Sequence, residues 1–189
     1  MNSREFVSFV FLAFAIYSPF QVLAQAHSAD SLHDHTFKPT SPFSAALTSL
    51  QIQIGYKFQS IGLLRRAMTH PSYSEDNNRA LSVLGANVIE TSVALRSLSK
   101  DIEISAKDLN RQISEISKVE SSCAIDGMGL GLQKVVRVSR KTNSSAPAVV
   151  CCAFRAIFGA IAIDIGKSDD AGSVFWSVHG GNVGRALPL

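Results

Sequence analysis

The sequence has few charged residues, and this shortage limits what the protein can be. Asp, Glu, Lys and Arg make up 17% of the 189 residues, and the formal net charge is only +3. Nucleic-acid-binding domains usually carry a dense stripe of Lys and Arg, which this composition does not favour. With 46% hydrophobic residues, the chain can bury one ordinary core. We therefore expect a single domain with short tails.

Cysteine is also scarce, with three residues at Cys123, Cys151 and Cys152. An odd set at this spacing suggests neither a disulfide framework nor a zinc site. Neighbouring cysteines such as Cys151 and Cys152 seldom bridge to each other, because the ring that would close is strained. Free cysteine is often buried as a small apolar side chain. The sequence therefore predicts three buried thiols.

The first 24 residues have the layout of a secretory signal peptide. One Arg and one Glu in the first five residues precede the apolar run Phe6–Phe20, and small residues follow at Val22 and Ala24. A membrane helix needs about 20 apolar residues, and this run is shorter and is interrupted by Ser18-Pro19. An organelle transit peptide is the second interpretation and a retained anchor the third. If the chain enters the secretory pathway, the sequon at Asn143 becomes a glycosylation site.

The rest of the chain divides into a linker, a helical domain and a tail. Residues 25–46 are polar and lack periodicity, so we expect a flexible linker there. The domain covers residues 47–181, and 182–189 form the tail. Helical spacing of apolar residues predicts helices over 47–54, 61–68, 79–98, 106–125 and 148–165.

Two of these predicted helices have features that indicate how they pack. Leu81, Leu84, Val88 and Leu95 line one face of the 79–98 helix, and a glycine in its middle, Gly85, suggests close packing. The 148–165 helix is almost wholly apolar and resembles a membrane span by length. A charged residue near its centre favours the central helix of a bundle instead.

Four stretches carry a resemblance to a known family: residues 54–58 (IGYKF), 63–73 (LLRRAMTHPSY), 78–89 (NRALSVLGANVI) and 152–166 (CAFRAIFGAIAIDIG). In the ribonuclease III endonuclease domain, the corresponding motifs read LGYxF, LLxxALTHxSY, NERLEFLGDAVL and DxFEAxxGAxxxDxG. The apolar positions of the two long helices agree. The chain thus resembles this family over roughly residues 47–181. The resemblance implies an all-α, ribonuclease III endonuclease-domain-like helical bundle.

The resemblance also implies where catalysis would occur and why it should be absent. The family cuts double-stranded RNA with four carboxylates that hold Mg²⁺, so that a metal-activated water attacks the phosphate. The matching positions here are Ser82, Ala86, Cys152 and Arg155. None supplies an anionic oxygen, and an arginine places positive charge where the cation would lie. We therefore expect no metal, no cofactor and no nuclease activity, and we do not expect Glu90 to restore the site.

Other matched positions bear on structure and on partners. Asp164 matches a family acid just after the catalytic helix, and we interpret it as a cap or loop anchor. Arg155 is expected to contact either a phosphate or a nearby carboxylate, with an internal ion pair favoured. Ribonuclease III domains usually pair, and the motif phenylalanine that plugs the partner is Val83 here, which weakens the case for a homodimer.

A compact basic stretch is the candidate for RNA contacts, although a solvated surface is the default interpretation. It contains Lys134, Arg137, Arg140 and Lys141. No aromatic stacking platform accompanies these residues, and the family's double-stranded-RNA-binding domain has no counterpart after residue 181. RNA binding would therefore rest on the helical domain alone.

The combination of leader, single domain and missing acids is similar to plant ribonuclease III-like proteins associated with defective nuclear fusion. That resemblance implies a role in karyogamy, for example of the polar nuclei in the female gametophyte. It suits a secretory leader, because the endoplasmic reticulum lumen is continuous with the nuclear envelope. Our first hypothesis is a non-catalytic interaction or scaffold protein with an unidentified protein partner. The alternative is an RNA-binding pseudonuclease that acts on structured RNA in a mitochondrion or plastid.

Overall fold

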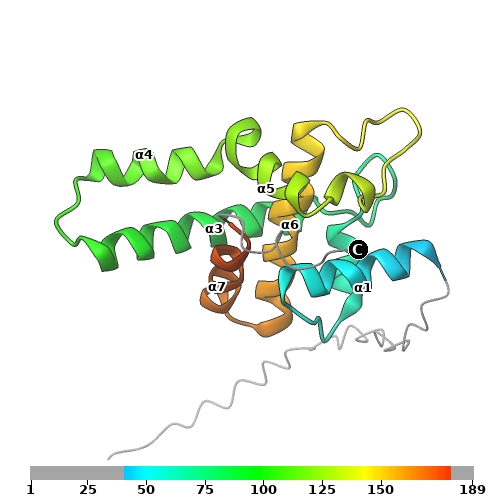
Figure 1. Cartoon of the computed structure of the whole chain (residues 1–189), viewed down its shortest axis with the longest axis horizontal. Helices are drawn as coiled ribbons and strands as arrows, with labels where there is room; N and C mark the ends of the chain where they lie inside the picture. The colour runs from blue at the N-terminus through cyan, green and yellow to red at the C-terminus, as the bar shows by residue number, and fades with distance from the viewer. Residues whose placement is uncertain (1–40, 180–189) are drawn as a thin grey trace, which may run out of the picture. The chain divides into compact units, whose positions relative to one another are not determined.

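The structure, a computed structural model, describes residues 41–179, and they form a bundle of helices (Figure 1). In chain order these are α1 Pro42–Ile54, α2 Ile61–Ala67, α3 Arg79–Lys100, α4 Ala106–Ser117, α5 Ala124–Gly129, α6 Pro147–Ile165 and α7 Ser168–Val178. Two short turns are also helical, the π-helical η1 Val119–Cys123 and the 3-10 helix η2 Leu132–Lys134. No strand occurs within this range, which confirms the all-α prediction. The expected leader and tail lie outside the described residues.

Helix α6 forms the centre of the bundle, and α2, α3, α5 and α7 pack around it. Its buried side chains point in several directions, and Phe154, Ile157, Phe158 and Ile161 are enclosed almost completely. An apolar helix of this kind is stable only when other elements cover it. By length and composition α6 would also suit a membrane span, yet 67% of its most apolar window is buried inside the protein. The prediction of a central bundle helix is confirmed.

Helices α3 and α6 approach closely because glycines replace side chains at their contact. A Cβ atom built on Gly85 would overlap the carbonyl of Arg155, and one built on Gly159 would overlap that of Leu81. Neither helix could come this near with alanine at the contact unless its backbone shifted. The close packing expected around Gly85 is therefore present, and it fixes the two helices that carry the four matched positions.

Helix α1 begins earlier than the sequence suggested. It starts at Pro42, so residues 42–46 are helical and do not belong to a linker. Ser41 caps the helix by accepting a hydrogen bond from the backbone N–H of Ser44, and proline suits the first helical position. At the other end Gly55 adopts a left-handed conformation with φ of 66°, as a C-cap glycine does.

Two expectations about α3 and α4 were wrong in detail. Leu81 and Val88 are buried as expected, but Leu84 and Leu95 are 37% and 51% exposed. The predicted 106–125 helix stops at Ser117, because Lys118 is extended and the chain then turns through η1. Helical spacing continues across this break, so periodicity alone did not reveal it.

The prediction of three free thiols was also wrong. Cys123 in η1 and Cys151 in α6 form a disulfide across 28 residues, with their Cα atoms 5.0 Å apart. Cys152 remains free and is half-buried. Both bonded cysteines are buried, as expected for small side chains. The bridge could not be inferred from spacing because it depends on η1 lying against α6.

Candidate functional site

The structure brings all four matched positions to the contact between α3 and α6. Ser82 and Ala86 lie one helical turn apart on α3, and Cys152 and Arg155 lie about one turn apart on α6. The carbonyl of Arg155 faces Gly85, which separates the two α3 positions in the sequence. All four residues are partly exposed. The four matched positions therefore lie on two helices that pack directly against each other.

Cys152 is held by a buried polar residue at the start of α3. Its thiol donates to Oδ1 of Asn78 at 3.4 Å, and Nδ2 of Asn78 donates to the carbonyl of Ala67 at 3.1 Å. Asn78 has no exposed surface, so these contacts satisfy a side chain that would otherwise be costly to bury. They connect the end of α2, the start of α3 and α6.

Arg155 reaches the C-terminal end of α4. Its Nη2 donates to the carbonyl of Ser117 at 2.6 Å, and the hydroxyl of Ser117 donates to Oε1 of Glu90 at 2.7 Å. The last carbonyls of a helix lack partners within the helix and carry partial negative charge, so a guanidinium is well suited there. The expected ion pair with a carboxylate is absent within residues 41–179, since Ser117 lies between Arg155 and Glu90.

These side chains do not fit a magnesium ion. They offer a hydroxyl, a methyl group, a thiol and a guanidinium, whereas Mg²⁺ prefers carboxylate and water oxygens in octahedral geometry. The nearby acid, Glu90, is already engaged with Ser117. Among the described residues, no group of three or more His, Cys, Asp and Glu side chains could hold a metal ion. The arrangement joins α3, α4 and α6 through hydrogen bonds.

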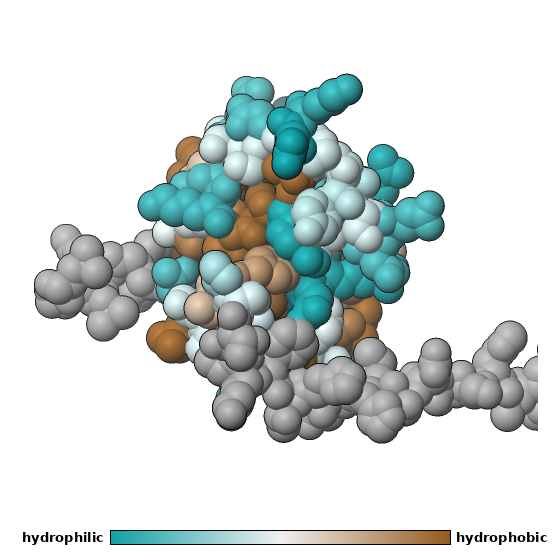
Figure 2. All heavy atoms as spheres, turned by 90° about the vertical axis from the view of Figure 1, so that its right-hand side faces the viewer, coloured by the Kyte–Doolittle hydropathy of each residue, from teal (hydrophilic) through white to brown (hydrophobic). Residues whose placement is uncertain are grey.

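The basic stretch does not form a uniform phosphate-binding surface. Arg137 turns inward, where its Nη2 donates to Oγ1 of Thr69 at 2.6 Å and its guanidinium lies 4.2 Å from the ring centre of Phe43. Lys134, Arg140 and Lys141 are exposed. Figure 2 shows hydrophilic side chains on several parts of the viewed face, with apolar ones between them.

Two basic side chains near this stretch have lowered pKa values. Burial lowers the pKa of Arg65, and repulsion by Arg137 adds to the effect. Burial likewise lowers the pKa of His70, with a further contribution from Arg79. Nδ1 of His70 accepts a hydrogen bond from the backbone N–H of Ser72 at 3.1 Å, which requires that nitrogen to be unprotonated. Burial of these two side chains, together with repulsion by the neighbouring cations, therefore disfavours their own charged forms.

Asp164 anchors a loop, as the sequence predicted. Its carboxylate accepts hydrogen bonds from the hydroxyl of Tyr56 at 2.7 Å and from the backbone N–H groups of Gln59 and Ser60 at 2.7 and 2.8 Å. The two backbone donors lie just before α2, so Asp164 on α6 anchors the loop that leads into this helix. Burial raises the pKa of Tyr56, and the bond to Asp164 raises it further.

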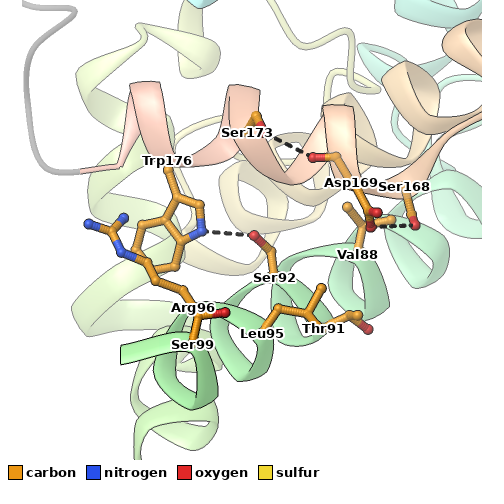
Figure 3. Close-up of a pocket in the computed structure, with 10 residues that line it drawn as sticks. All are labelled: Val88, Thr91, Ser92, Leu95, Arg96, Ser99, Ser168, Asp169, Ser173 and Trp176. Carbon is orange, nitrogen blue, oxygen red and sulfur yellow. Dashed lines mark hydrogen bonds between the residues drawn. The ribbon is translucent and has the colours of Figure 1, made fainter. Parts of the chain in front are cut away.

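A shallow cleft between α3 and α7 was not anticipated from the sequence (Figure 3). Its volume is about 250 Å³. Nε1 of Trp176 donates to Oγ of Ser92 at 2.8 Å, and the guanidinium of Arg96 lies 4.1 Å from the centre of the indole ring. Trp176 is the only tryptophan in the chain, and this was the one feature of the sequence that could have drawn attention to the cleft.

Two further predicted positions lie at the surface. Asn143 is exposed, and its Oδ1 accepts a hydrogen bond from the backbone N–H of Ser145 at 2.9 Å. Val83 is 65% exposed on α3, beside Leu84. Both are accessible to another molecule.

Comparisons with known proteins agree with this fold. The profile of a family described as Ribonuclease-III-like matches residues 60–176. Protein NUCLEAR FUSION DEFECTIVE 2 of Arabidopsis thaliana is 59% identical over 150 residues, which cover 79% of this chain and 78% of that protein. Ribonuclease 3 of Albidiferax ferrireducens is 32% identical over 124 residues. This match covers 64% of the chain and 54% of the bacterial protein, so the chain spans about half the length of that relative.

Solved structures of the nuclease domain of ribonuclease III from Campylobacter jejuni are also similar. One has a TM-score of 0.66 at 24% identity and covers 70% of this chain and 94% of that chain. Another has a TM-score of 0.64 at 23% identity and covers 75% and 96%. At this level of identity the similarity shows a shared fold.

Proposed function

The chain belongs to the ribonuclease-III-like family, and we propose that it is a member that does not cleave RNA and acts as an interaction or scaffold protein in nuclear fusion. The role in nuclear fusion rests on the name of the Arabidopsis relative, with which the chain shares 59% identity. The loss of catalysis rests on the chemistry of the four matched positions. Together they suggest that the fold has been retained for contacts with another molecule.

The observation that carries the proposal is the arrangement at Arg155. A family member that binds Mg²⁺ needs a carboxylate at this position, whereas here the side chain is cationic. Its hydrogen bond to the carbonyl of Ser117 ties α6 to the end of α4. Ser82, Ala86 and Cys152 add no charged oxygen nearby. A positively charged side chain among these residues opposes cation binding by direct repulsion.

A secretory compartment is part of this proposal. The disulfide between Cys123 and Cys151 supports it, because such bonds persist in oxidising compartments and are rare in reducing ones. The exposed sequon at Asn143 would be available to glycosylation there. The endoplasmic reticulum lumen and the nuclear envelope both satisfy these conditions. A mitochondrion or plastid is the alternative location.

Magnesium binding tests the proposal directly. A ligand that binds only the native state raises the free energy of unfolding by RT ln(1 + [L]/Kd), so a protein without the site should not respond. We expect the thermal unfolding midpoint to be the same with Mg²⁺ as with an equal ionic strength of Na⁺. A Mg²⁺-dependent rise that disappears in Glu90→Ala would show that another acid has replaced the lost ligands, and the proposal would then fail.

RNA binding without cleavage is the second candidate function. The exposed side chains of Lys134, Arg140 and Lys141 favour it, since phosphate contacts supply most of the affinity for duplex nucleic acid. The inward orientation of Arg137 argues against a large footprint. A homodimer is compatible with either function, and the exposed Val83 would then lie at or near the contact.

A further inference from the structure

The loop that joins η2 to α6 carries two adjacent basic residues, Arg140 and Lys141, and both are exposed. In Figure 1 this loop is the yellow segment that extends beyond the helices just before α6. None of the residues from 137 to 148 is buried. Neither Arg140 nor Lys141 has a carboxylate within ion-pair distance among the described residues. Both side chains are therefore open to another molecule.

The backbone of this loop is held mainly by hydrogen bonds within the loop. The backbone N–H of Thr142 donates to the carbonyl of Ser139 at 3.0 Å, and that of Ala146 donates to the carbonyl of Asn143 at 3.2 Å. Contact with another segment comes earlier, where the backbone N–H of Ser139 donates to Oγ of Ser72 at 3.0 Å. Opening one such turn costs only about 1 kcal/mol, since water replaces the lost partner. Exposed loop tips of this kind are preferred sites of proteolytic cleavage.

Other basic residues of the described chain are less accessible to a protease. The second adjacent pair, Arg65-Arg66, lies within α2. A helix must open locally before a protease can bind its backbone, and that opening costs free energy. Lys167 is exposed, but it stands in the short connection between the end of α6 and the start of α7. The loop before α6 therefore combines a basic pair with an accessible backbone.

The disulfide determines what a cut in this loop would produce. Cys123 precedes the loop and Cys151 follows it, so their bond encloses Arg140 and Lys141. Hydrolysis after Lys141 consumes one water and leaves a carboxylate on Lys141 and an amine on Thr142. The two resulting chains stay joined through the two sulfur atoms, and the packing of α3 against α6 also holds them together. A cut therefore divides the chain without releasing a fragment.

We propose that this loop is a processing site at which a basic-specific serine endoprotease of the secretory pathway converts the protein into two disulfide-linked chains, and that a glycan on Asn143 blocks the cut. Such proteases select Lys and Arg with a carboxylate in their specificity pocket. Asn143 is exposed and lies two residues after Lys141. Because a protease binds residues on both sides of the bond it cuts, a bulky glycan there excludes it. The proposal rests on the secretory compartment proposed above.

Limited digestion of the unglycosylated full chain tests the accessibility of the loop. With trypsin, the first cut within residues 41–179 should fall after Arg140 or Lys141. The product should give two fragments on a reducing gel and remain one species without reductant, because Cys123 and Cys151 lie on opposite sides of the cut. A first cut elsewhere in that range, or fragments that separate without reductant, would overturn the proposal.

Substitution of the basic pair provides the specific variant. Arg140→Gln together with Lys141→Gln should slow the first cut at least about tenfold, because the protease pocket requires a positive side chain. Lys167→Gln is the matched control, since it removes another exposed basic residue outside a helix. It should leave the rate unchanged. All three side chains are exposed, so the unfolding midpoints should stay close to that of the unmodified protein. Equal effects of the two variants on the rate would contradict the proposal.

Expression of the full chain in secreting cells tests the natural step. The variant Asn143→Gln should appear as two disulfide-linked chains, the second beginning at Lys141 or Thr142. The glycosylated, unmodified chain should remain uncut. A variant that stays uncut, or a glycosylated chain that is cut as readily, would refute the proposal.

One further outcome would assign the basic pair to a different partner. If duplex RNA protects the loop from trypsin and salt steeply weakens that protection, Arg140 and Lys141 contact phosphates, and the processing site is wrong. None of these digestions would alter the magnesium measurement. Failure of this inference and failure of the proposed function can therefore be distinguished.

Discussion

Gly85 of α3 and Gly159 of α6 meet without a side chain between them. A Cβ atom built on Gly85 would lie 2.9 Å from the backbone nitrogen of Gly159, and one built on Gly159 would lie 3.0 Å from that of Gly85. Such distances are shorter than a carbon atom tolerates against backbone. The contact sets how closely α3 and α6 approach, and through it the relative positions of Ser82, Ala86, Cys152 and Arg155.

Replacing Gly85 by alanine should therefore destabilise the protein strongly. The added methyl group must push α3 away from α6, and overpacking of this kind costs about 3 kcal/mol when the clash is with backbone. Gly62→Ala is the matched control, because its Cβ would meet only Oγ of Ser60 at 3.8 Å. Since Gly62 lies within a helix, that change should be neutral or stabilising by about 0.5–1 kcal/mol. Urea unfolding measures both, and similar effects at the two sites would contradict the packing at this contact.

Breaking the disulfide should lower stability without abolishing the fold. A bridge that closes a loop of 28 residues restricts the unfolded chain, which corresponds to about 3–4 kcal/mol in the loop-entropy description. We expect Cys123→Ser to lower the free energy of unfolding by that amount and Cys152→Ser to have little effect. Thiol counting of the denatured, unreduced protein checks the pairing. It should find one free thiol, and three would refute the bridge.

The stability of the protein should fall as the pH drops below about 6.5, partly because of His70. Its pKa is lowered in the folded protein, so the unfolded chain binds the proton more tightly. The contribution of His70 is therefore fully present above the unfolded pKa of about 6.5 and is lost as the pH falls through the lower folded pKa. His70→Gln should make the decline shallower in urea unfolding at several pH values. If the free energy of unfolding of His70→Gln falls with pH as steeply as that of the unmodified protein, His70 does not contribute to the decline.

The leader and the sequon can be tested together in the native cell type. If the leader is secretory, the mature chain should start after Ala24 or Ala26, and Asn143 should carry glycan. Terminal sequencing and the mobility shift after glycosidase treatment measure the two features. Asn143→Gln should abolish the shift and leave the terminus unchanged. An unglycosylated chain inside mitochondria or plastids would contradict the secretory location.

Sequence reasoning worked best where the pattern depended on neighbouring residues. The five predicted helical regions occur, although the fourth is shorter than predicted, and Gly85 and Asp164 have the roles expected of them. It failed where contacts distant in sequence decided the result. The bond between Cys123 and Cys151 requires a π-helical turn that interrupts a helix-like pattern, and Arg155 bonds to a carbonyl whose position depends on the end of α4.

The cleft between α3 and α7, which Trp176 lines, belongs to this second class. Its lining comes from two helices far apart in the sequence, so no single stretch of sequence predicts it. The amphipathic spacing of α4 predicted a helix with one apolar side. Which neighbours would cover that side could be learned only from the packing of the whole bundle.

Cleavage of duplex RNA with Mg²⁺ is the most direct test of the central claim that this ribonuclease-III-like chain is not a nuclease. The unmodified protein should leave the RNA intact at any Mg²⁺ concentration. A quadruple variant that restores four carboxylates should be measured beside it. This variant should gain a Mg²⁺-dependent rise in its unfolding midpoint, and its substitutions are Ser82→Glu, Ala86→Asp, Cys152→Asp and Arg155→Glu. Mg²⁺-dependent cleavage by the unmodified chain that survives purification to constant specific activity would contradict the account.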